Sequence, residues 1–138
     1  MRQQRKPKAR PFAKLERVAR DVYNDSNCCT VIALAAATGW SFGKAQAHCA
    51  RHGRVTGQGM TEVEMISAYR AAGLLLEPID SKCTLGAASR TLPDDGIYLI
   101  LSTRHITCVR KGVAVDWIDG TERKRVRKAW KVDGNVIV

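Results

Sequence analysis

The sequence predicts an α+β fold, with helices in the first half of the chain and an antiparallel β-sheet in the second. Helical spacing of apolar residues and helix-capping signals occur before Gly73, whereas runs rich in β-branched residues occur after it. A length of 138 residues, with 45% hydrophobic and 26% charged residues, suits one globular domain. We therefore expect a single domain over residues 12–138, preceded by a flexible basic arm over residues 1–11.

The first two helices are predicted from their apolar residues. Residues 12–22 carry apolar side chains at three- and four-residue steps, and the polar sequence YNDSN ends this run. From Cys29 to Thr38 the sequence is apolar on every side of a helix, which is typical of a buried helix, and Gly39 ends it. We expect this second helix to lie at the centre of the domain.

Capping signals predict two further helices. Ser41 is placed as the N-cap of a helix that continues to about His52. Thr61 and Glu64 form a T-x-x-E capping box, which begins another helix that stops at Gly73.

The rest of the chain is rich in strand signals. The sequence TLGAASRTL is either a short helix or a turn, and the end of the chain places an Asp133–Gly134 turn between two strand candidates. The other predicted strands are LLLEPI, IYLIL (97–101), HITCV (105–109) and VAVDWI (113–118).

Basic residues gather at both ends of the chain. The net charge is +10, and of the 23 Lys and Arg residues eight lie in the first 20 positions and six between Arg123 and Lys131. Basic ends of this kind attract nucleic acid or an acidic protein surface, and they fit equally a tail that keeps the protein soluble. Nucleic-acid binding through the arm and residues 123–131 is therefore one hypothesis.

The cysteines and the hydropathy pattern indicate the compartment. The five cysteines form neither a disulfide framework nor a CxxC pair, so we expect a reduced, intracellular protein with free thiols. No apolar run approaches the roughly 20 residues that span a bilayer, and no apolar segment follows the basic N-terminus as in a signal peptide. We expect no membrane association.

Two adjacent cysteines precede the central helix, and one of them is a candidate nucleophile. If Cys29 begins the helix, unpaired N–H groups and the positive end of the helix dipole point at its sulfur, which lowers a thiol's pKa and favours the thiolate. Cys28 is then the cap or a loop residue. The alternative is that both cysteines are small buried hydrophobic residues.

A thiol nucleophile needs a base, and His105 is the best candidate. It begins the HITCV strand, and a two-residue turn at Lys111–Gly112 would place Asp116 opposite Thr107. Asp116 would then be a diagonal neighbour of His105 on the same face, able to orient the imidazole. Alternatively, His105 is a half-buried strand residue and Asp116 a residue at a strand end.

The other two histidines, His48 and His52, are i, i+4 neighbours on the third predicted helix. This spacing can bind a metal, yet no third ligand lies at a recognised distance and no HExxH glutamate is present. We interpret them as a pair on the helix surface and expect no metal.

The order and spacing of these segments resemble papain-like cysteine peptidases, and particularly small bacteriophage C39-peptidase-like proteins. The resemblance covers residues 24–118 and implies a papain-like fold, thiol acyl transfer and no cofactor. The stretch NCCTVIALAAATG is similar to an N-D-C-T-V-R-A-L-A-x-A-T-G pattern in such proteins. The other similar segments are SFGKAQAHCARHGR, GMTEVEMISAYRAAG and GIYLILSTRHITCVRKGVAVDW.

Aligned on its ATG sequence, the family's cysteine falls on Cys29 and the preceding Asp on Cys28. A papain-like enzyme carries a Gln about six residues before the nucleophile, which donates to the oxyanion; Tyr23 stands there. Asn24 is the best side-chain donor available nearby, and the Cys29 backbone N–H would be a second donor.

Two hypotheses of function follow from this reading. In the first, Cys29, His105 and Asp116, assisted by Asn24, hydrolyse a peptide or isopeptide bond of a host or phage protein in the host cytoplasm. In the second, the papain-like fold is catalytically weak or inactive and binds a host factor or nucleic acid through its basic ends.

Overall fold

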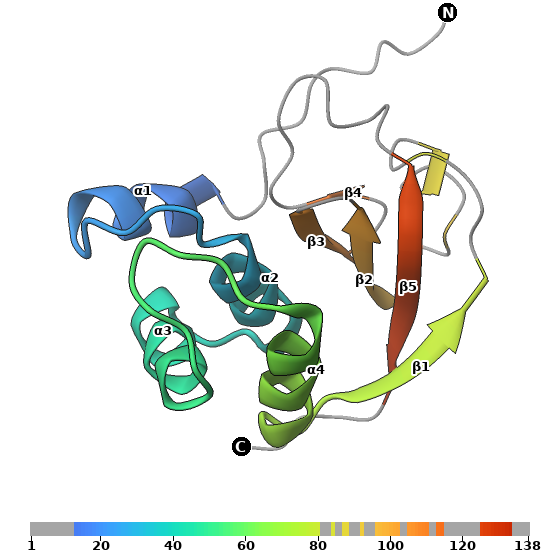
Figure 1. Cartoon of the computed structure of the whole chain (residues 1–138). Coiled ribbons are helices and arrows are strands. Elements are labelled where there is room, and N and C mark those ends of the chain that lie inside the picture. The colour runs from blue at the N-terminus through green and yellow to red at the C-terminus, as the bar shows by residue number, and fades with distance from the viewer. Residues whose placement is uncertain are drawn as a thin grey trace, which may run out of the picture.

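The computed structural model describes residues 13–80, 84, 87–88, 92, 96–102, 105–110, 113–114 and 125–133. Within them, four helices and a five-stranded antiparallel sheet form one domain in which α2 packs against the sheet, which confirms the α+β class (Figure 1). The arm predicted over residues 1–11 lies outside the described residues. The helices are α1 (Ala13–Asp21), α2 (Cys29–Thr38), α3 (Phe42–Arg51) and α4 (Glu62–Ala71). The strands are β1 (Leu75–Ile79), β2 (Ile97–Ser102), β3 (His105–Arg110), β4 (Val113–Ala114) and β5 (Val126–Asp133).

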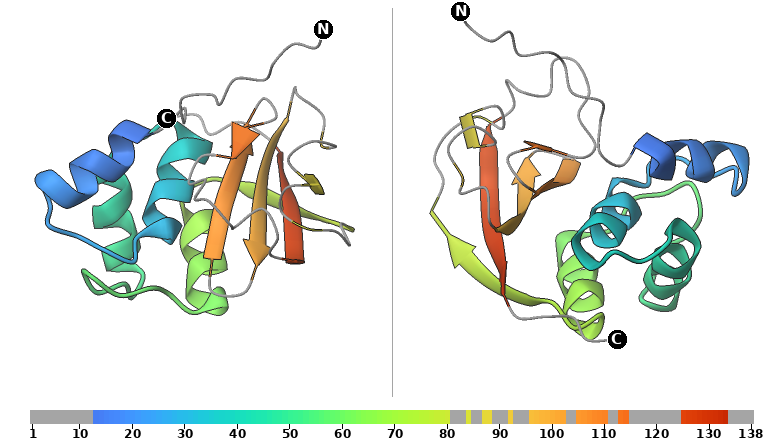
Figure 2. Two further views of the ribbon diagram at one scale, coloured as in Figure 1. Left: turned by 90° about the horizontal axis from the view of Figure 1, so that it is seen from above. Right: turned by 180° about the vertical axis from the view of Figure 1, so that it is seen from behind.

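Helix α2 lies at the centre of the domain, as its apolar sequence predicts. It packs against β3 on one side and α3 on the other, and α1 covers α3 from outside (Figures 1 and 2). Its residues from Thr30 to Ala37 are all buried. A helix in this position cannot present a polar face, which explains the absence of charged residues between Cys29 and Gly39.

The helix ends follow the predicted capping signals. The Ser41 hydroxyl accepts a hydrogen bond from the Lys44 N–H at 3.2 Å, and Thr61 and Glu64 form the complete capping box. Gly39 ends α2 at φ 84°, a left-handed conformation that glycine adopts without a steric cost.

The sheet has the strand order β1-β5-β2-β3-β4, so the last described strand is inserted between β1 and β2. Pairing of Val109 with Ala114 and of Arg110 with Val113 confirms the register predicted for the β3–β4 hairpin. Strand β5 begins at Val126, earlier than the predicted KAWKV run, and its continuation past Asp133 lies outside the described residues.

The sheet is covered on its two faces by different groups of residues. Leu99, Cys108 and Trp130 belong to the main core beneath the helices. Tyr98, Ile100, Val109 and Ala129 form a second, smaller cluster. Alternating strand residues thus separate the two clusters, as the pleat requires.

Candidate functional site

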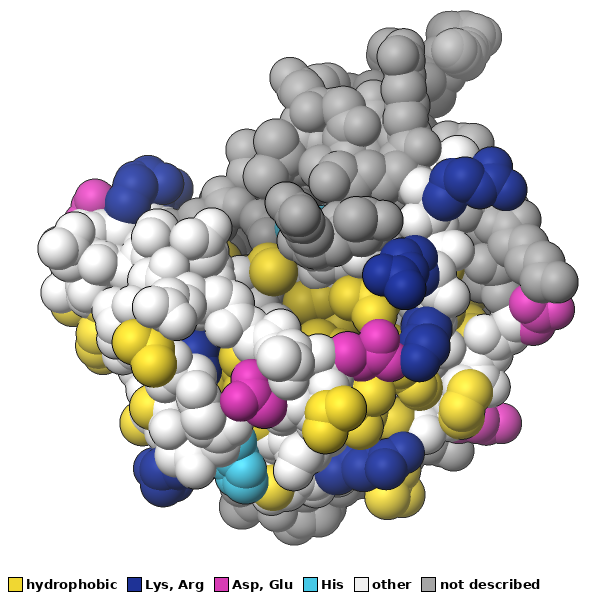
Figure 3. All heavy atoms as spheres, in the orientation of Figure 1, with side chains coloured by type: hydrophobic (Ala, Val, Ile, Leu, Met, Phe, Trp, Pro, Cys, Tyr) yellow, Lys and Arg dark blue, Asp and Glu magenta, His cyan; other side chains and the backbone are white. Residues whose placement is uncertain are grey.

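A cavity of about 330 Å³ lies between the start of α2, the start of α4 and the ends of β2, β3 and β5. Figure 3 shows hydrophobic side chains at a hollow in this face, with basic and acidic side chains beside it. The described residues that line the cavity are Cys29, Thr30, Gly59, Met60, Glu62, Met65, Leu101, Ser102, His105, Ile106 and Arg127. A thiol and an imidazole from distant parts of the chain therefore share one cavity.

The structure separates the two adjacent cysteines. Cys29 is the first residue of α2, is half-buried and lines the cavity. Cys28 is the N-cap, makes no side-chain capping hydrogen bond and is not among the described lining residues. Its carbonyl accepts the first helical hydrogen bond from the Ile32 N–H at 2.9 Å. Of the two thiols, Cys29 is the one that lines the cavity.

His105 is placed by the β2–β3 hairpin. It is the first residue of β3 and pairs with Ser102, the last residue of β2. The buried Ser102 hydroxyl donates to the His105 carbonyl at 3.3 Å, which ties the two strand ends together. The His105 side chain is half-buried and its Nε2 atom is buried. The hairpin thus holds this imidazole at the edge of the cavity.

The cavity lining that the structure describes includes neither of the other two predicted site residues. Asp116 lies outside the described residues, although the confirmed pairs of the β3–β4 hairpin have the register from which its position was inferred. Asn24 lies in the loop before α2, is exposed and adopts φ 51°. It is not among the described residues that line the cavity.

A buried ion pair between the loop before Cys29 and the loop after α3 was not predicted from the sequence. Asp25 and Arg54 are 4% and 5% exposed, and their side chains meet through two hydrogen bonds of 2.8 and 2.9 Å. The Asp25 carboxylate also accepts from Gln46 Nε2 at 2.8 Å and from the Gly57 N–H at 2.7 Å. Arg54 in turn donates to the Ser26 carbonyl at 3.0 Å. The loop after α3 thereby fixes the loop that leads into Cys29.

These contacts set the charge state of Asp25. Burial by itself would raise the pKa of this carboxyl, but hydrogen bonds from Arg54, Gln46 and Gly57 and the charge of Arg54 lower its pKa to about 2. Burial by itself would lower the pKa of Arg54, but the hydrogen bonds to Asp25 and the charge of its carboxylate raise it. Both groups are therefore ionised throughout the neutral range, and the pair is permanent there.

The loop that this pair holds has an unusual backbone. Asn24 and Asn27 both have positive φ, at 51° and 50°. Asparagine tolerates this left-handed region better than most residues. Asn27 is tied further by a hydrogen bond from its Nδ2 to the Gly57 carbonyl at 2.9 Å. The sequence YNDSN predicts a break between helices, but nothing local indicates that its Asp would be buried.

The first turn of α2 has two further features that bear on the cavity. The Tyr69 hydroxyl, fully buried on α4, donates to the Thr30 carbonyl at 2.7 Å. Burial raises the pKa of Tyr69 well above its usual value, so the hydroxyl remains a donor. The Thr30 hydroxyl is buried and has no hydrogen-bond partner among the described residues. It is a polar group beside Cys29 that sequence analysis did not identify.

His48, in α3, has a structural role. His48 is only 7% exposed, so the interpretation of a surface pair is wrong for this residue. Its Nε2 lies 2.7 Å from the Ala68 carbonyl, and its ring packs edge-on against Trp40 at 5.4 Å. His48 thus links α3 to α4, because a buried imidazole needs such a partner. Among the described residues, no three His, Cys, Asp or Glu side chains gather as metal ligands would.

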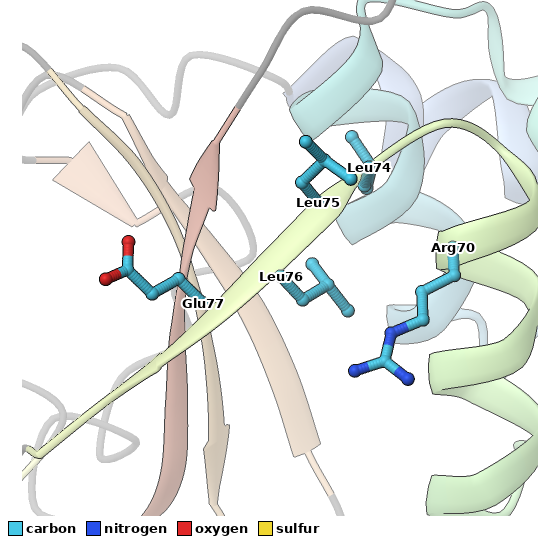
Figure 4. Close-up of a pocket in the computed structure, with 5 residues that line it drawn as sticks. All are labelled: Arg70, Leu74, Leu75, Leu76 and Glu77. Carbon is cyan, nitrogen blue, oxygen red and sulfur yellow. The ribbon is translucent and has the colours of Figure 1, made fainter.

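A second cavity, of about 630 Å³, lies where α4 leads into β1. Arg70, Leu74, Leu75, Leu76 and Glu77 line it, and Figure 4 shows Glu77 pointing away from Arg70 on the other side of β1. Its described lining contains neither a thiol nor an imidazole. The chemistry of the described residues therefore favours the smaller cavity as the candidate functional site.

Comparison with protein-family models, curated proteins and solved structures found no match for this chain. Of the helices in the described part of the chain, none has the length and apolar character that a bilayer crossing requires.

Proposed function

We propose that this protein is a cysteine hydrolase with a papain-like arrangement of its site, in which Cys29 is the nucleophile and His105 the general base. One observation carries the proposal: the first residue of the buried helix and the first residue of β3 line the same cavity. A helix N-terminus favours the thiolate, and a nearby imidazole can receive the thiol proton. The resemblance noted in the sequence supports the same assignment.

The reaction would be hydrolysis of a peptide or isopeptide bond in two steps. His105 takes the Cys29 proton, the sulfur bonds to the substrate carbonyl carbon, and the imidazolium returns the proton to the amine as the C–N bond breaks. Water then attacks the thioester with His105 as base, which releases the acid and restores the thiol. No cofactor is required by these steps.

The remaining predicted residues would support these two groups. Asp116 would accept a hydrogen bond from the His105 ring and hold its orientation. Asn24 and the Cys29 N–H would donate to the oxyanion. We propose that the substrate is a host or phage protein, and that the protein acts in the reducing cytoplasm of the host.

Thiol alkylation tests the assignment directly. Burial raises the pKa of Cys49 to about 11, and Cys108 is also buried, so neither should compete for a reagent. Cys83 lies outside the described residues, so the experiment uses a Cys83→Ser background. We expect iodoacetamide to modify Cys29 before Cys28, and His105→Ala to slow this modification about 10-fold or more.

Cys28→Ser is the matched control, since it removes the neighbouring thiol and leaves the proposed pair. It should alkylate at the rate of the background protein. Equal modification of Cys28 and Cys29 that is indifferent to His105 would overturn the proposal.

A second candidate function rests on the charge of β5. Arg127 and Lys128 are exposed on this strand, and Arg125, which directly precedes it, is exposed as well. Such a group, together with the basic arm, would bind nucleic acid, and its affinity would fall steeply with salt. Loss of DNA and RNA binding on removal of residues 1–11, with full biological activity in Cys29→Ser, would favour this function over hydrolysis.

A further inference from the structure

Strand β5 contains an irregularity beside the cavity. Leu101 pairs with Lys128, but the next residue of β2, Ser102, pairs with Val126, so Arg127 is an extra residue in the ladder. This is a β-bulge, which places two residues of one strand opposite one of its neighbour. Bulges commonly redirect a side chain and often occur beside functional sites.

The bulge changes the face to which Arg127 belongs. Val126 packs on the same small cluster as Ala129, three residues later, whereas strict alternation would put these two residues on opposite faces. Arg127 and Lys128 therefore both belong to the helix-covered side, where Lys128 contacts Glu62 of α4 and Arg127 lines the cavity. An unbroken strand would have turned Arg127 away from Cys29 and His105.

Among the described residues, no carboxylate compensates the charge of Arg127. Glu62 is the described acidic residue of the lining, and its carboxylate forms an ion pair with Lys128. Arg127 is exposed and has no carboxylate within 4 Å among the residues that the structure describes. A guanidinium in this state offers a planar pair of donors that matches a carboxylate.

The other lining residues determine which part of a ligand can bind beside the Arg127 guanidinium. Met60, Met65, Leu101 and Ile106 give the cavity an apolar wall. Methionine side chains adapt to different apolar shapes, so this wall would accept a branched or unbranched aliphatic side chain. A ligand that fits both features carries an aliphatic side chain and an acidic one next to each other.

We propose that Arg127 binds a substrate carboxylate at the mouth of the cavity, so that the substrate is a peptide with an Asp or Glu next to an aliphatic residue. This proposal rests on the proposed function, which makes the ligand a peptide. It adds the class of peptide and a residue that determines specificity. The net charge of +10 supports it, because an acidic peptide is attracted to the protein before it docks.

The test uses binding, so that it does not depend on turnover. Fluorescein-labelled, amidated Ala-Glu-Leu-Glu-Ala and its Gln and Lys counterparts are titrated against Cys29→Ala protein by fluorescence anisotropy in 150 mM salt. Amidation removes the C-terminal carboxylate, and the carboxylate of the label is the same in all three peptides, so only the side chains differ. We expect the Glu peptide to bind about 5-fold more tightly than the Gln peptide, the size of effect expected for a partly exposed arginine–carboxylate pair.

Variants of the two arginines separate this site from general attraction. Arg127→Gln should abolish the preference for the Glu peptide, and Arg127→Glu should reverse it toward the Lys peptide. Arg127→Lys keeps the charge but loses the planar pair of donors, so it should retain only part of the preference. Arg125→Gln removes the same charge two residues away, outside the cavity lining, and should keep the preference.

Two results would overturn the proposal. One is a preference for the Glu peptide that is equal in Arg127→Gln and Arg125→Gln, which would show attraction by net charge alone. The other is the absence of binding of all three peptides at millimolar concentration. Failure of the proposed function would be seen instead in the alkylation of Cys29, whatever Arg127 binds.

Discussion

Replacement of Asp25 by Asn tests whether the buried ion pair holds the loop before Cys29. The amide keeps the shape of the carboxylate but has only one acceptor oxygen for donors from Arg54, Gln46 and Gly57. It also leaves the Arg54 guanidinium buried without a counter-charge. Removal of one partner of a buried pair costs about 3–5 kcal/mol of unfolding free energy, and we expect Asp25→Asn to lose that much at pH 7.

The loss should depend on pH in a defined direction. The pKa of Asp25 is lowered from 3.8 to about 2, so its contribution is present above pH 4 and is lost as the pH falls toward 2. The linkage relation gives a loss of about 1 kcal/mol by pH 3 and about 2 kcal/mol in total. Asp25→Asn lacks this titration. The difference in unfolding free energy between the two proteins should therefore narrow by these amounts as the pH falls.

Urea unfolding at pH 7, 5, 4 and 3, followed by circular dichroism, measures this difference. Asp21→Asn is the matched control, since Asp21 is an exposed residue at the end of α1, and it should change the free energy of unfolding by under about 0.5 kcal/mol. If Asp25→Asn costs no more than Asp21→Asn, or if its deficit is the same at pH 7 and pH 3, the assigned role of the pair is wrong.

Four further changes follow from named contacts. Tyr69→Phe removes the donor to the Thr30 carbonyl and should cost about 1–2 kcal/mol in urea unfolding, because a buried hydrogen bond between α4 and α2 is lost. Thr61→Ala breaks the capping box of α4 and should cost about 1 kcal/mol in the same assay. Thr30→Val removes a buried hydroxyl without a described partner, so stability should be unchanged or higher. If the Thr30 hydroxyl contacts the substrate, Thr30→Val should hydrolyse a peptide about 3- to 10-fold more slowly in an assay quenched at timed intervals. An unchanged rate of hydrolysis would exclude the contact. Asp25→Leu combined with Arg54→Met should recover most of the stability lost in Asp25→Asn. Iodoacetamide should nevertheless modify Cys29 of this double variant more slowly than Cys29 of the unchanged protein.

The helices were predictable because their signals are local. Ser41, Thr61 and Glu64 cap the helices they were expected to cap, and the apolar run after Cys29 is the buried helix. The β3–β4 register was also predictable, since a two-residue turn determines which residues pair. In each case the deciding residues lie within a few positions of one another.

The features that were missed depend on contacts between distant segments. The insertion of β5 between β1 and β2 joins strands that no local pattern connects. Burial of Asp25 requires the loop after α3 to fold back on it, and the bulge at Arg127 appears only when β5 is aligned with β2. The roles of Asp116 and Asn24 stay predictions, whereas the shared cavity of Cys29 and His105 is a property of the structure.

A buried ion pair is seldom the most stable way to fill a core, because the desolvation of two charges can exceed their attraction. What the Asp25–Arg54 pair provides is geometry, since five hydrogen bonds to one carboxylate define a single arrangement of the surrounding backbone. An apolar contact of equal volume would bury the loop but would leave its two left-handed asparagines free to relax. The position of Cys29 relative to His105 then depends on a charge pair in the loop before α2. Loss of that pair should therefore reduce thiol reactivity even where the fold survives.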